Sequence, residues 1–194
     1  WYLLSHTRLI QNLYKHLGIP FSMDSKIPKH IAIILDGNRR FARKLGMQPW
    51  KGHEYGLKKL QELIDWCLEI GIKELTLYSF STENFDRAKN EKDFLFGLFK
   101  QEFDKIRQKK GLFKKNVRVN VIGRVNMFPE DIKKAMLEVV EKTKCYDGLV
   151  VNFALAYGGR QEITDAVREI AKDVEEGKIK IKKINEELIT NHLY

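Results

Sequence analysis

The residues Ile31-Ala32-Ile33-Ile34-Leu35 form an unbroken apolar run, and Asp36-Gly37-Asn38 follows it directly. A short apolar run of this kind is typical of a central parallel strand that is covered on both faces. The Asp-Gly-Asn sequence is a strong turn signal, so the strand should end there. We therefore expect a buried strand at 31–35 that leads through a tight turn into the next segment.

Helices and strands alternate along the rest of the chain. Between 53 and 68 the apolar residues fall on one helical stripe, and Gly71 stands at the C-cap position. The segments expected after it are a strand at 74–80, a helix at 94–106, a strand at 117–122, a helix opened by Pro129, a strand at 149–154 and a helix that continues through Glu162. This order predicts an α/β fold with an open, mostly parallel sheet, helices on both faces, and a ligand site at the carboxyl ends of the strands.

The segment before the first strand has a different pattern. Apolar residues from Leu3 to Leu17 recur at helical spacing, and Gly18 and Pro20 end the pattern. We expect an N-terminal amphipathic helix and linker at 1–27, followed by one domain at 28–194. The helix could pack on that domain or, because basic residues accompany it, contact a membrane surface or the substrate entrance.

Composition and charge limit the function classes. The 194 residues carry a net charge of +9, which suits nucleic acid, an anionic membrane surface or phosphorylated small molecules. No apolar run is long enough to span a bilayer, and Cys67 and Cys145 lack the spacing of a zinc site or a disulfide framework. We expect a soluble, cytoplasmic protein.

Basic residues cluster just after the first strand. Arg39, Arg40 and Arg43 can form charge-assisted hydrogen bonds to an anion, and Gly37 lets the backbone turn closely around it. Asp36 would weaken an anion site unless it held a metal ion, and Mg²⁺ binds through one or two carboxylates together with substrate phosphates. Asp36 is therefore a candidate Mg²⁺ ligand; the simpler alternative is a helix-capping residue paired with a neighbouring arginine.

Two further loops follow strands and should lie at the same edge of the sheet. Residues 81–87 offer hydroxyl and amide groups, Arg87, and an apolar wall at Phe85, although a capped turn that opens a helix would use the same residues. Residues 157–160, Tyr-Gly-Gly-Arg, follow the last expected strand, and glycine pairs also occur at such turns for steric reasons alone. The three loops together predict a shared anion pocket.

These motifs in this order, 34–40, His53, 81–85 and 157–160, resemble the cis-prenyltransferase family, which includes undecaprenyl and dehydrodolichyl diphosphate synthases. The resemblance extends from about Pro28 to the last residue, and the N-terminal helix is similar to that of archaeal and eukaryotic members. It implies a Mg²⁺-dependent transferase, assembled as a homodimer, that condenses isopentenyl diphosphate onto an allylic diphosphate such as farnesyl or geranylgeranyl diphosphate. The product would be a long-chain cis-polyprenyl diphosphate, the precursor of dolichol or undecaprenyl lipid carriers.

The resemblance also implies roles for individual residues. Asp36 would hold Mg²⁺ as the diphosphate departs, and Asn84 would take part in proton removal or orientation. The allylic substrate would contact Gly37, Asn38, Arg39, Arg40 and Phe41, with His53 close by. The second substrate loop would comprise Ser81, Thr82 and Glu83, with Phe85 as an aromatic wall and Arg87 as a diphosphate ligand. The growing chain needs an apolar tunnel, for which the candidates are Leu95, Leu98, Phe99, Phe103 and Ile106; the same residues would suit an ordinary core.

The chain also departs from the family pattern. Pro49 stands four residues before His53, where members usually carry an arginine that contacts the diphosphate. The family continues beyond the equivalent of 186–193 into a further strand, the main isopentenyl diphosphate site, and a glutamate that completes the metal site, often across the dimer interface. The resemblance therefore implies that residues 1–194 lack this C-terminal part and are inactive alone.

Two other function classes fit parts of the sequence. A non-catalytic partner subunit of a cis-prenyltransferase would share the fold, but the intact Asp36-Gly37-Asn38 and Asn84 favour an enzyme. A basic nucleic-acid-binding domain would use the net charge of +9, but base-stacking aromatic residues do not alternate with the basic ones. An isoprenyl transferase that does not bind nucleic acid is the preferred interpretation.

Overall fold

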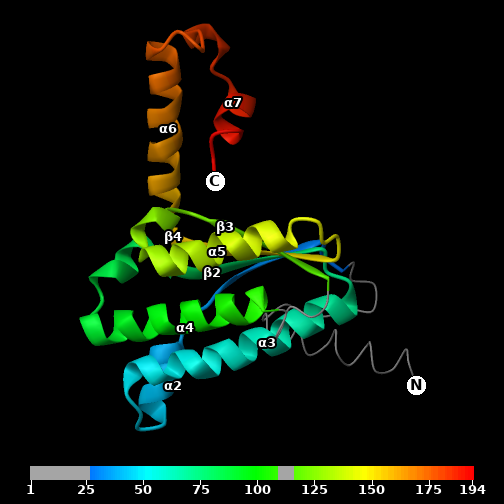
Figure 1. Ribbon diagram of the computed structural model, residues 1–194, viewed down its shortest axis with the longest axis vertical. Coiled ribbons are helices and arrows are strands. Elements are labelled where there is room, and N and C mark those ends of the chain that lie inside the picture. Colours follow the sequence, from blue (N-terminus) through cyan, green and yellow to red (C-terminus); the bar gives the residue numbers. More distant parts are fainter. Residues whose placement is uncertain (1–26, 109–115) are drawn as a thin grey trace.

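The computed structural model describes residues 27–108 and 116–194 (Figure 1). The sheet of the described chain has four strands in the order β1-β2-β4-β3, and every neighbouring pair is parallel. The strands are β1 (His30–Ile34), β2 (Glu74–Ser81), β3 (Val117–Ile122) and β4 (Leu149–Tyr157). The expected open, parallel α/β fold is confirmed, whereas the predicted N-terminal helix lies outside the described residues.

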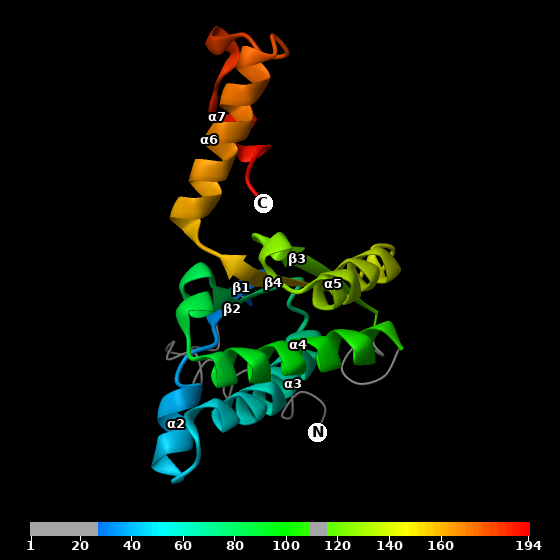
Figure 2. The same cartoon turned by 60° about the vertical axis from the view of Figure 1, so that its left-hand side comes forward.

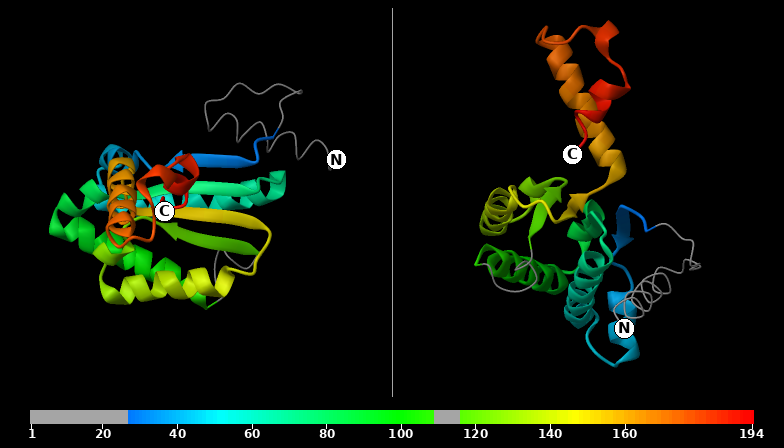
Figure 3. Two further views of the ribbon diagram at one scale, coloured as in Figure 1. Left: turned by 90° about the horizontal axis from the view of Figure 1, so that it is seen from above. Right: turned by 90° about the vertical axis from the view of Figure 1, so that its right-hand side faces the viewer.

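Helices lie on both sides of the sheet, but more of them cover one face than the other (Figures 1 and 3). One face is covered by α3 (Gly52–Ile70), α4 (Lys89–Arg107) and α5 (Glu130–Thr143). On the other side α6 (Gly159–Glu175) projects away from the sheet with α7 (Glu186–Thr190) beside it, as Figure 2 also shows. The short α2 (Asn38–Lys44) lies at the opposite end of the molecule from α6.

The core forms because alternate strand residues and one stripe of each covering helix are apolar. Leu75 and Leu77 of β2 and Val151 of β4 are fully buried. The buried residues of α3 recur every three or four positions and include Leu60, Ile64, Cys67 and Ile70. Burial raises the pKa of the Cys67 thiol to about 12, so this cysteine stays protonated as part of the core.

Two expectations about the strands need correction. β1 is not central, because it lies at an edge of the described sheet and Ile34 is 72% exposed. The apolar run 31–35 is therefore covered on only one face by the described residues. β4 continues to Tyr157, beyond its expected end at 154, because Leu155 and Ala156 extend the buried apolar pattern.

The proposed tunnel residues belong mainly to the core. Leu95, Phe103 and Ile106 are buried in the same apolar cluster as the strands, and Phe99 packs against it. Core packing, one of the two interpretations of these residues, is thus confirmed for them. A tunnel along α4 stays a prediction. In the part of the chain that the structure describes, no helix combines the length and apolar character needed to cross a bilayer.

The parallel arrangement brings the loops after β1, β2 and β4 to one edge of the sheet. Ser81 is in register with Tyr157, and Ile34 is in register with Tyr78. The loop that starts at Asp36 therefore lies beside the loop that starts after Ser81. This edge is where an open α/β sheet places its ligand site.

Candidate functional site

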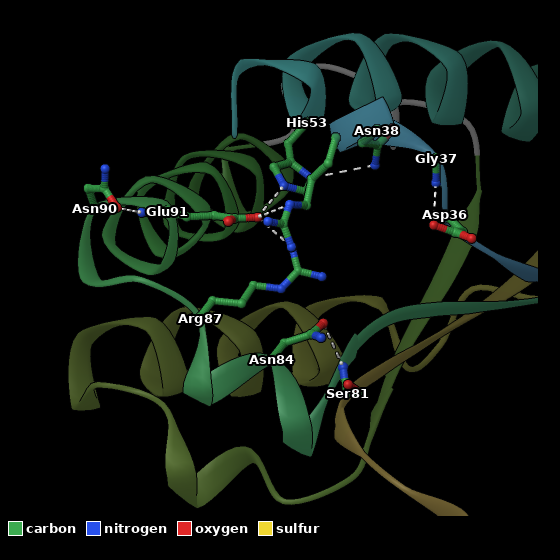
Figure 4. Close-up of polar contacts among 10 residues, drawn as sticks. Asp36, Gly37, Asn38, His53, Ser81, Asn84, Arg87, Asn90 and Glu91 are labelled. Carbon is green, nitrogen blue, oxygen red and sulfur yellow. Dashed lines mark hydrogen bonds and ion pairs between the residues drawn. The ribbon is translucent and has the colours of Figure 1, made fainter. Parts of the chain in front are cut away.

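The loop after β1 turns sharply into α2. Gly37 has φ 88°, in the left-handed region that favours glycine. Its N–H donates to one carboxylate oxygen of Asp36, as Figure 4 shows, and Arg40 Nη2 lies 2.9 Å from the other oxygen. Both side chains of this ion pair are more than 70% exposed, at 75% for Asp36 and 72% for Arg40. Such a pair contributes at most about 1 kcal/mol, so Asp36 can exchange Arg40 for another cation at little cost.

Two glycines bring the start of α3 against Asn38. A Cβ atom on Gly52 would lie 2.0 Å from the backbone oxygen of Asn38, and one on Gly56 would lie 2.5 Å from Asn38 Oδ1. Neither position has room for a side chain. The close packing brings Asn38 Nδ2 within 3.5 Å of His53 Nδ1, so the two predicted site residues are neighbours.

A polar cavity of about 250 Å³ opens at the carboxyl end of β1. Its lining comprises Leu35, Asp36, Gly37, Asn38, Arg39, Arg40, Arg43, His53 and Arg87. The lining has four arginines but only one carboxylate, so the cavity favours an anion with more than one negative charge. Because Arg87 comes from the loop after β2, the first two predicted loops share this cavity.

A buried carboxylate on α4, that of Glu91, contacts two of the four arginines of this cavity. Glu91 is 5% exposed, and its Oε1 accepts a hydrogen bond from Arg87 Nη1 at 2.6 Å. Arg39 Nε lies 3.7 Å from the same oxygen. Burial alone would raise the pKa of Glu91, but the hydrogen bonds from Arg87 and His53 outweigh it and hold this pKa below its usual value. Glu91 is therefore charged and orients both arginines.

His53 lies between Asn38 and Glu91, as Figure 4 shows. Burial and the nearby arginines lower the pKa of His53 more than the hydrogen bond to Glu91 raises it. In the neutral ring, Nε2–H donates to Glu91 across 3.4 Å and Nδ1 accepts from the Asn38 amide, which is the tautomer that this hydrogen-bond network assigns. His53 thus connects α2 with α4.

The loop after β2 is a capped 3-10 turn, η2 (Thr82–Asp86). The N–H of Ser81 donates to Asn84 Oδ1 at 3.2 Å, so the capped-turn interpretation of this loop is confirmed. The same loop also borders a second cavity of about 460 Å³. Its lining comprises Arg39, Glu83, Asn84, Asp86, Arg87, Ala88 and Glu91. Arg39 and Arg87 line both cavities, which are therefore neighbours.

Aromatic rings support the second loop. The ring centroid of Phe85 lies 5.0 Å from that of Phe80 and 5.4 Å from that of Phe128. Phe85 lines neither of the two cavities described above and here anchors the loop. Phe41 also lies outside both linings, with its ring 5.3 Å from that of Tyr55. Substrate contact by these two phenylalanines stays a prediction.

The loop at 157–160 flanks the second loop without lining either of these cavities. Tyr157 is in register with Ser81, and a Cβ atom on Gly158 would lie 3.3 Å from Thr82 Oγ1. A hydrogen bond to Glu162, together with burial, raises the pKa of Tyr157 to about 12. The first two predicted loops thus form the cavities, and the third supports them through Ser81 and Thr82.

The donor set for a metal ion is small. Across residues 27–108 and 116–194, no three His, Cys, Asp or Glu side chains are grouped so that they could hold a metal ion. Asp36 is a single exposed carboxylate on the lining of the arginine-rich cavity. Mg²⁺ needs only one or two carboxylates where substrate phosphates and water supply the other ligands. The residues present fit a cation that binds together with a phosphate group.

Sequence reasoning missed three residues of this site: Glu91, Gly52 and Gly56. The spacing of four between Arg87 and Glu91 is a signal for a helical ion pair, but it does not reveal that the pair is buried beside His53. The demand for glycine arises only from the packing of α3 on α2. Pro49, which stands where the resemblance predicts an arginine, begins the short helix η1 (Pro49–Lys51) and lines neither cavity.

Comparisons with known proteins agree with this geometry. The protein-family model described as "Putative undecaprenyl diphosphate synthase" matches residues 34–194. The tritrans,polycis-undecaprenyl-diphosphate synthase (geranylgeranyl-diphosphate specific) of Thermococcus kodakarensis is 53% identical over 168 residues, which cover 87% of this chain and 64% of that protein. The protein of the same name from Archaeoglobus fulgidus is 46% identical over 186 residues, which cover 96% of this chain and 74% of that protein.

Two solved structures of prenyl diphosphate synthases are also similar to this chain. Lavandulyl diphosphate synthase from Lavandula x intermedia, in complex with dimethylallyl diphosphate, matches with a TM-score of 0.79 and 31% identity, over 86% of this chain and 70% of that one. A "probable undecaprenyl diphosphate synthase" from Campylobacter jejuni matches with a TM-score of 0.66 and 35% identity, over 87% of this chain and 70% of that one. The chain belongs to the undecaprenyl diphosphate synthase family of cis-prenyltransferases. It spans 64% of the length of the T. kodakarensis relative.

Proposed function

We propose that the protein joins isopentenyl diphosphate to an allylic diphosphate and builds a long-chain cis-polyprenyl diphosphate. The observation that carries this proposal is the cavity lined by four arginines together with Asp36. The names of the archaeal relatives specify geranylgeranyl diphosphate, which is therefore the proposed primer, with an undecaprenyl product. A homodimer is proposed as well, because the family resemblance implies it. A cytoplasmic location is proposed because Cys67 and Cys145 lack the spacing of a disulfide framework.

Departure of the diphosphate is the step that the first cavity would assist. Cleavage of the allylic carbon–oxygen bond leaves a cation on the hydrocarbon and extra negative charge on the diphosphate, and preorganised positive groups stabilise that charge as it develops. Arg39 and Arg87 are already oriented by Glu91, so they would need little rearrangement. Mg²⁺ held by Asp36 would supply further charge stabilisation when bound. Arg40 could then turn from Asp36 to the diphosphate.

Formation of the carbon–carbon bond would follow at the border of the two cavities. The double bond of isopentenyl diphosphate donates its electron pair to the allylic cation that remains after the diphosphate has departed with the electrons of the broken carbon–oxygen bond. The isopentenyl unit then loses a proton to water. Asn84 lines the second cavity and carries a carboxamide, which does not accept a proton at neutral pH. Of the two roles predicted for Asn84, we therefore propose orientation of the isopentenyl group.

A calorimetric titration with geranylgeranyl thiolodiphosphate, an analogue that resists cleavage, tests the binding part of this proposal. Binding should be weaker in Arg87→Gln by about 10- to 100-fold, because a charge-assisted hydrogen bond contributes about 1.5–3 kcal/mol. Arg118→Gln is the matched control, since Arg118 is exposed on β3 and loses the same charge far from the cavities. In Asp36→Asn, added Mg²⁺ should no longer strengthen binding. Equal binding of geranylgeraniol, which has no diphosphate, would contradict the proposal.

A further inference from the structure

An apolar cluster lies exposed next to the site but outside both cavities. Phe41, Leu45 and Tyr55, which we call the tip patch, are 44%, 52% and 42% exposed. Leu45 follows Phe41 by one helical turn, and the rings of Phe41 and Tyr55 are in contact at 5.3 Å. Single exposed apolar residues are common, but three neighbouring large ones mark an interaction surface more often. Diphosphate binding does not account for Leu45 and Tyr55, because neither lines a cavity described above.

Exposed lysines surround the tip patch. Lys44 lies beside Phe41 on the same face of α2. Lys51, the last residue of η1, lies four residues before Tyr55, and Lys58 of α3 lies three residues after it. The Nζ atom of Lys58 lies 5.7 Å from the Tyr55 ring centroid. From residue 38 to residue 58 the chain carries six lysines and arginines but only one acidic residue. The surroundings of the patch are therefore strongly positive.

Within residues 27–108 and 116–194, the position of the patch leaves it accessible. α2 lies at the end of the molecule opposite α6 and α7, so a flat surface can approach it without meeting the sheet or α6 (Figures 1 and 2). Apolar and aromatic side chains ringed by lysines are the pattern of proteins that lie on anionic bilayers, where the rings sit at the headgroup level and the lysines meet the lipid charge. Three apolar side chains are too few to form a stable protein–protein interface by themselves, because such an interface takes about 20–30 residues a side.

We propose that the tip patch docks the protein on an anionic lipid bilayer. Phe41, Leu45 and Tyr55 enter the interfacial region, while Lys44, Lys51 and Lys58 contact lipid headgroups. The proposal goes beyond the proposed function, since docking does not require prenyl transfer. It concerns α2 and α3 rather than the N-terminal helix predicted at 1–27, for which membrane contact was one of the alternatives.

Sedimentation with lipid vesicles tests the lysines. The protein should bind vesicles of phosphatidylcholine with phosphatidylglycerol, bind phosphatidylcholine alone much more weakly, and dissociate at high salt. Each lysine near an anionic surface changes binding by about fivefold, so Lys44→Gln, Lys51→Gln and Lys58→Gln together should weaken it by about a hundredfold. The control removes the same charge from the far end of the molecule by changing Lys180, Lys182 and Lys183 to Gln. Equal losses in the two triple variants would overturn the proposal.

A fluorescence measurement tests the apolar contact and distinguishes a membrane from another occupant. In a Cys145→Ser background, Leu45→Cys can be labelled selectively with an environment-sensitive dye, because Cys67 is buried. The emission should shift to the blue when anionic vesicles are added, whereas a dye on Lys182→Cys should not respond. A blue-shifted emission in buffer alone would show that protein, either this chain or a second copy, covers the patch. That result, or vesicle binding without any shift at position 45, would overturn the proposal.

Discussion

Replacing Glu91 with Gln should loosen the site, because one buried carboxylate oxygen serves three partners. Glu91 Oε1 lies 2.6 Å from Arg87 Nη1, 3.4 Å from His53 Nε2 and 3.7 Å from Arg39 Nε. Loss of one partner from a fully buried ion pair costs about 3–5 kcal/mol. Arg87 and Arg39 are 23% and 46% exposed, so water will screen them and the free energy of unfolding should fall by only about 2 kcal/mol.

Two assays measure this effect. Urea denaturation gives the change in the free energy of unfolding, and Glu102→Gln is the control. Glu102 is on the same helix and forms an ion pair with Lys105 at 2.6 Å, but neither residue lines either of the two cavities. The control should lose less than about 1 kcal/mol. NMR of the imidazole nitrogens reports on His53, whose pKa should fall further in Glu91→Gln, since the interaction that raises it is lost while burial and the arginines remain. An unchanged His53 pKa would refute the role of Glu91.

Three further predictions concern residues that hold the loops of the candidate site in place. The pKa of His53 in the folded protein is below the usual 6.5, so below pH 6.5 the unfolded chain binds more protons than the folded protein. The free energy of unfolding should therefore decrease as the pH falls through this range. His53→Asn should remove this part of the pH dependence. Gly56→Ala should weaken binding of geranylgeranyl thiolodiphosphate, because the new Cβ would displace the Asn38 side chain. Gly97→Ala is the control: its Cβ would meet no atom within 4 Å, so it should add about 0.5–1 kcal/mol to the free energy of unfolding without changing binding. Phe80→Ala should cost about 3–5 kcal/mol in urea denaturation, because the ring is fully buried among four other phenylalanines.

Each of these has a contrary outcome. The same pH profile in His53→Asn as in the parent would mean that His53 is not the titrating group. Wild-type binding by Gly56→Ala would mean that α2 and α3 separate without consequence for the cavity. A loss below about 1 kcal/mol in Phe80→Ala would show that the aromatic cluster does not anchor η2.

Local signals predicted the elements of the fold because strands and helices are encoded within a few residues. The strand at 117–122 and the end of α3 at Gly71 are as expected, since apolar alternation and a left-handed glycine mark them directly. The edge position of β1 was not predictable in this way. The apolar run 31–35 has the composition of a covered strand, but the order of strands depends on how α3, α4 and α5 cross the sheet.

The site was predictable where charge and turn chemistry coincide in sequence. Asp36, Gly37 and Arg39 lie within four residues, so their loop could be interpreted without knowledge of the fold. Glu91 could not, because its role depends on contact with His53, which is 38 residues away. The two roles considered for Asp36 are also related, since the exposed Arg40 that pairs with it can release it.

The central claim is that the diphosphate of an allylic substrate binds in the arginine-lined cavity after β1. A crystal structure of the protein with geranylgeranyl thiolodiphosphate and Mg²⁺ tests it most directly. The diphosphate should lie within hydrogen-bonding distance of Arg39 and Arg87, with the cation between the diphosphate and Asp36. A diphosphate bound elsewhere, for example among the lysines that follow α6, with the cavity filled only by water, would contradict the claim.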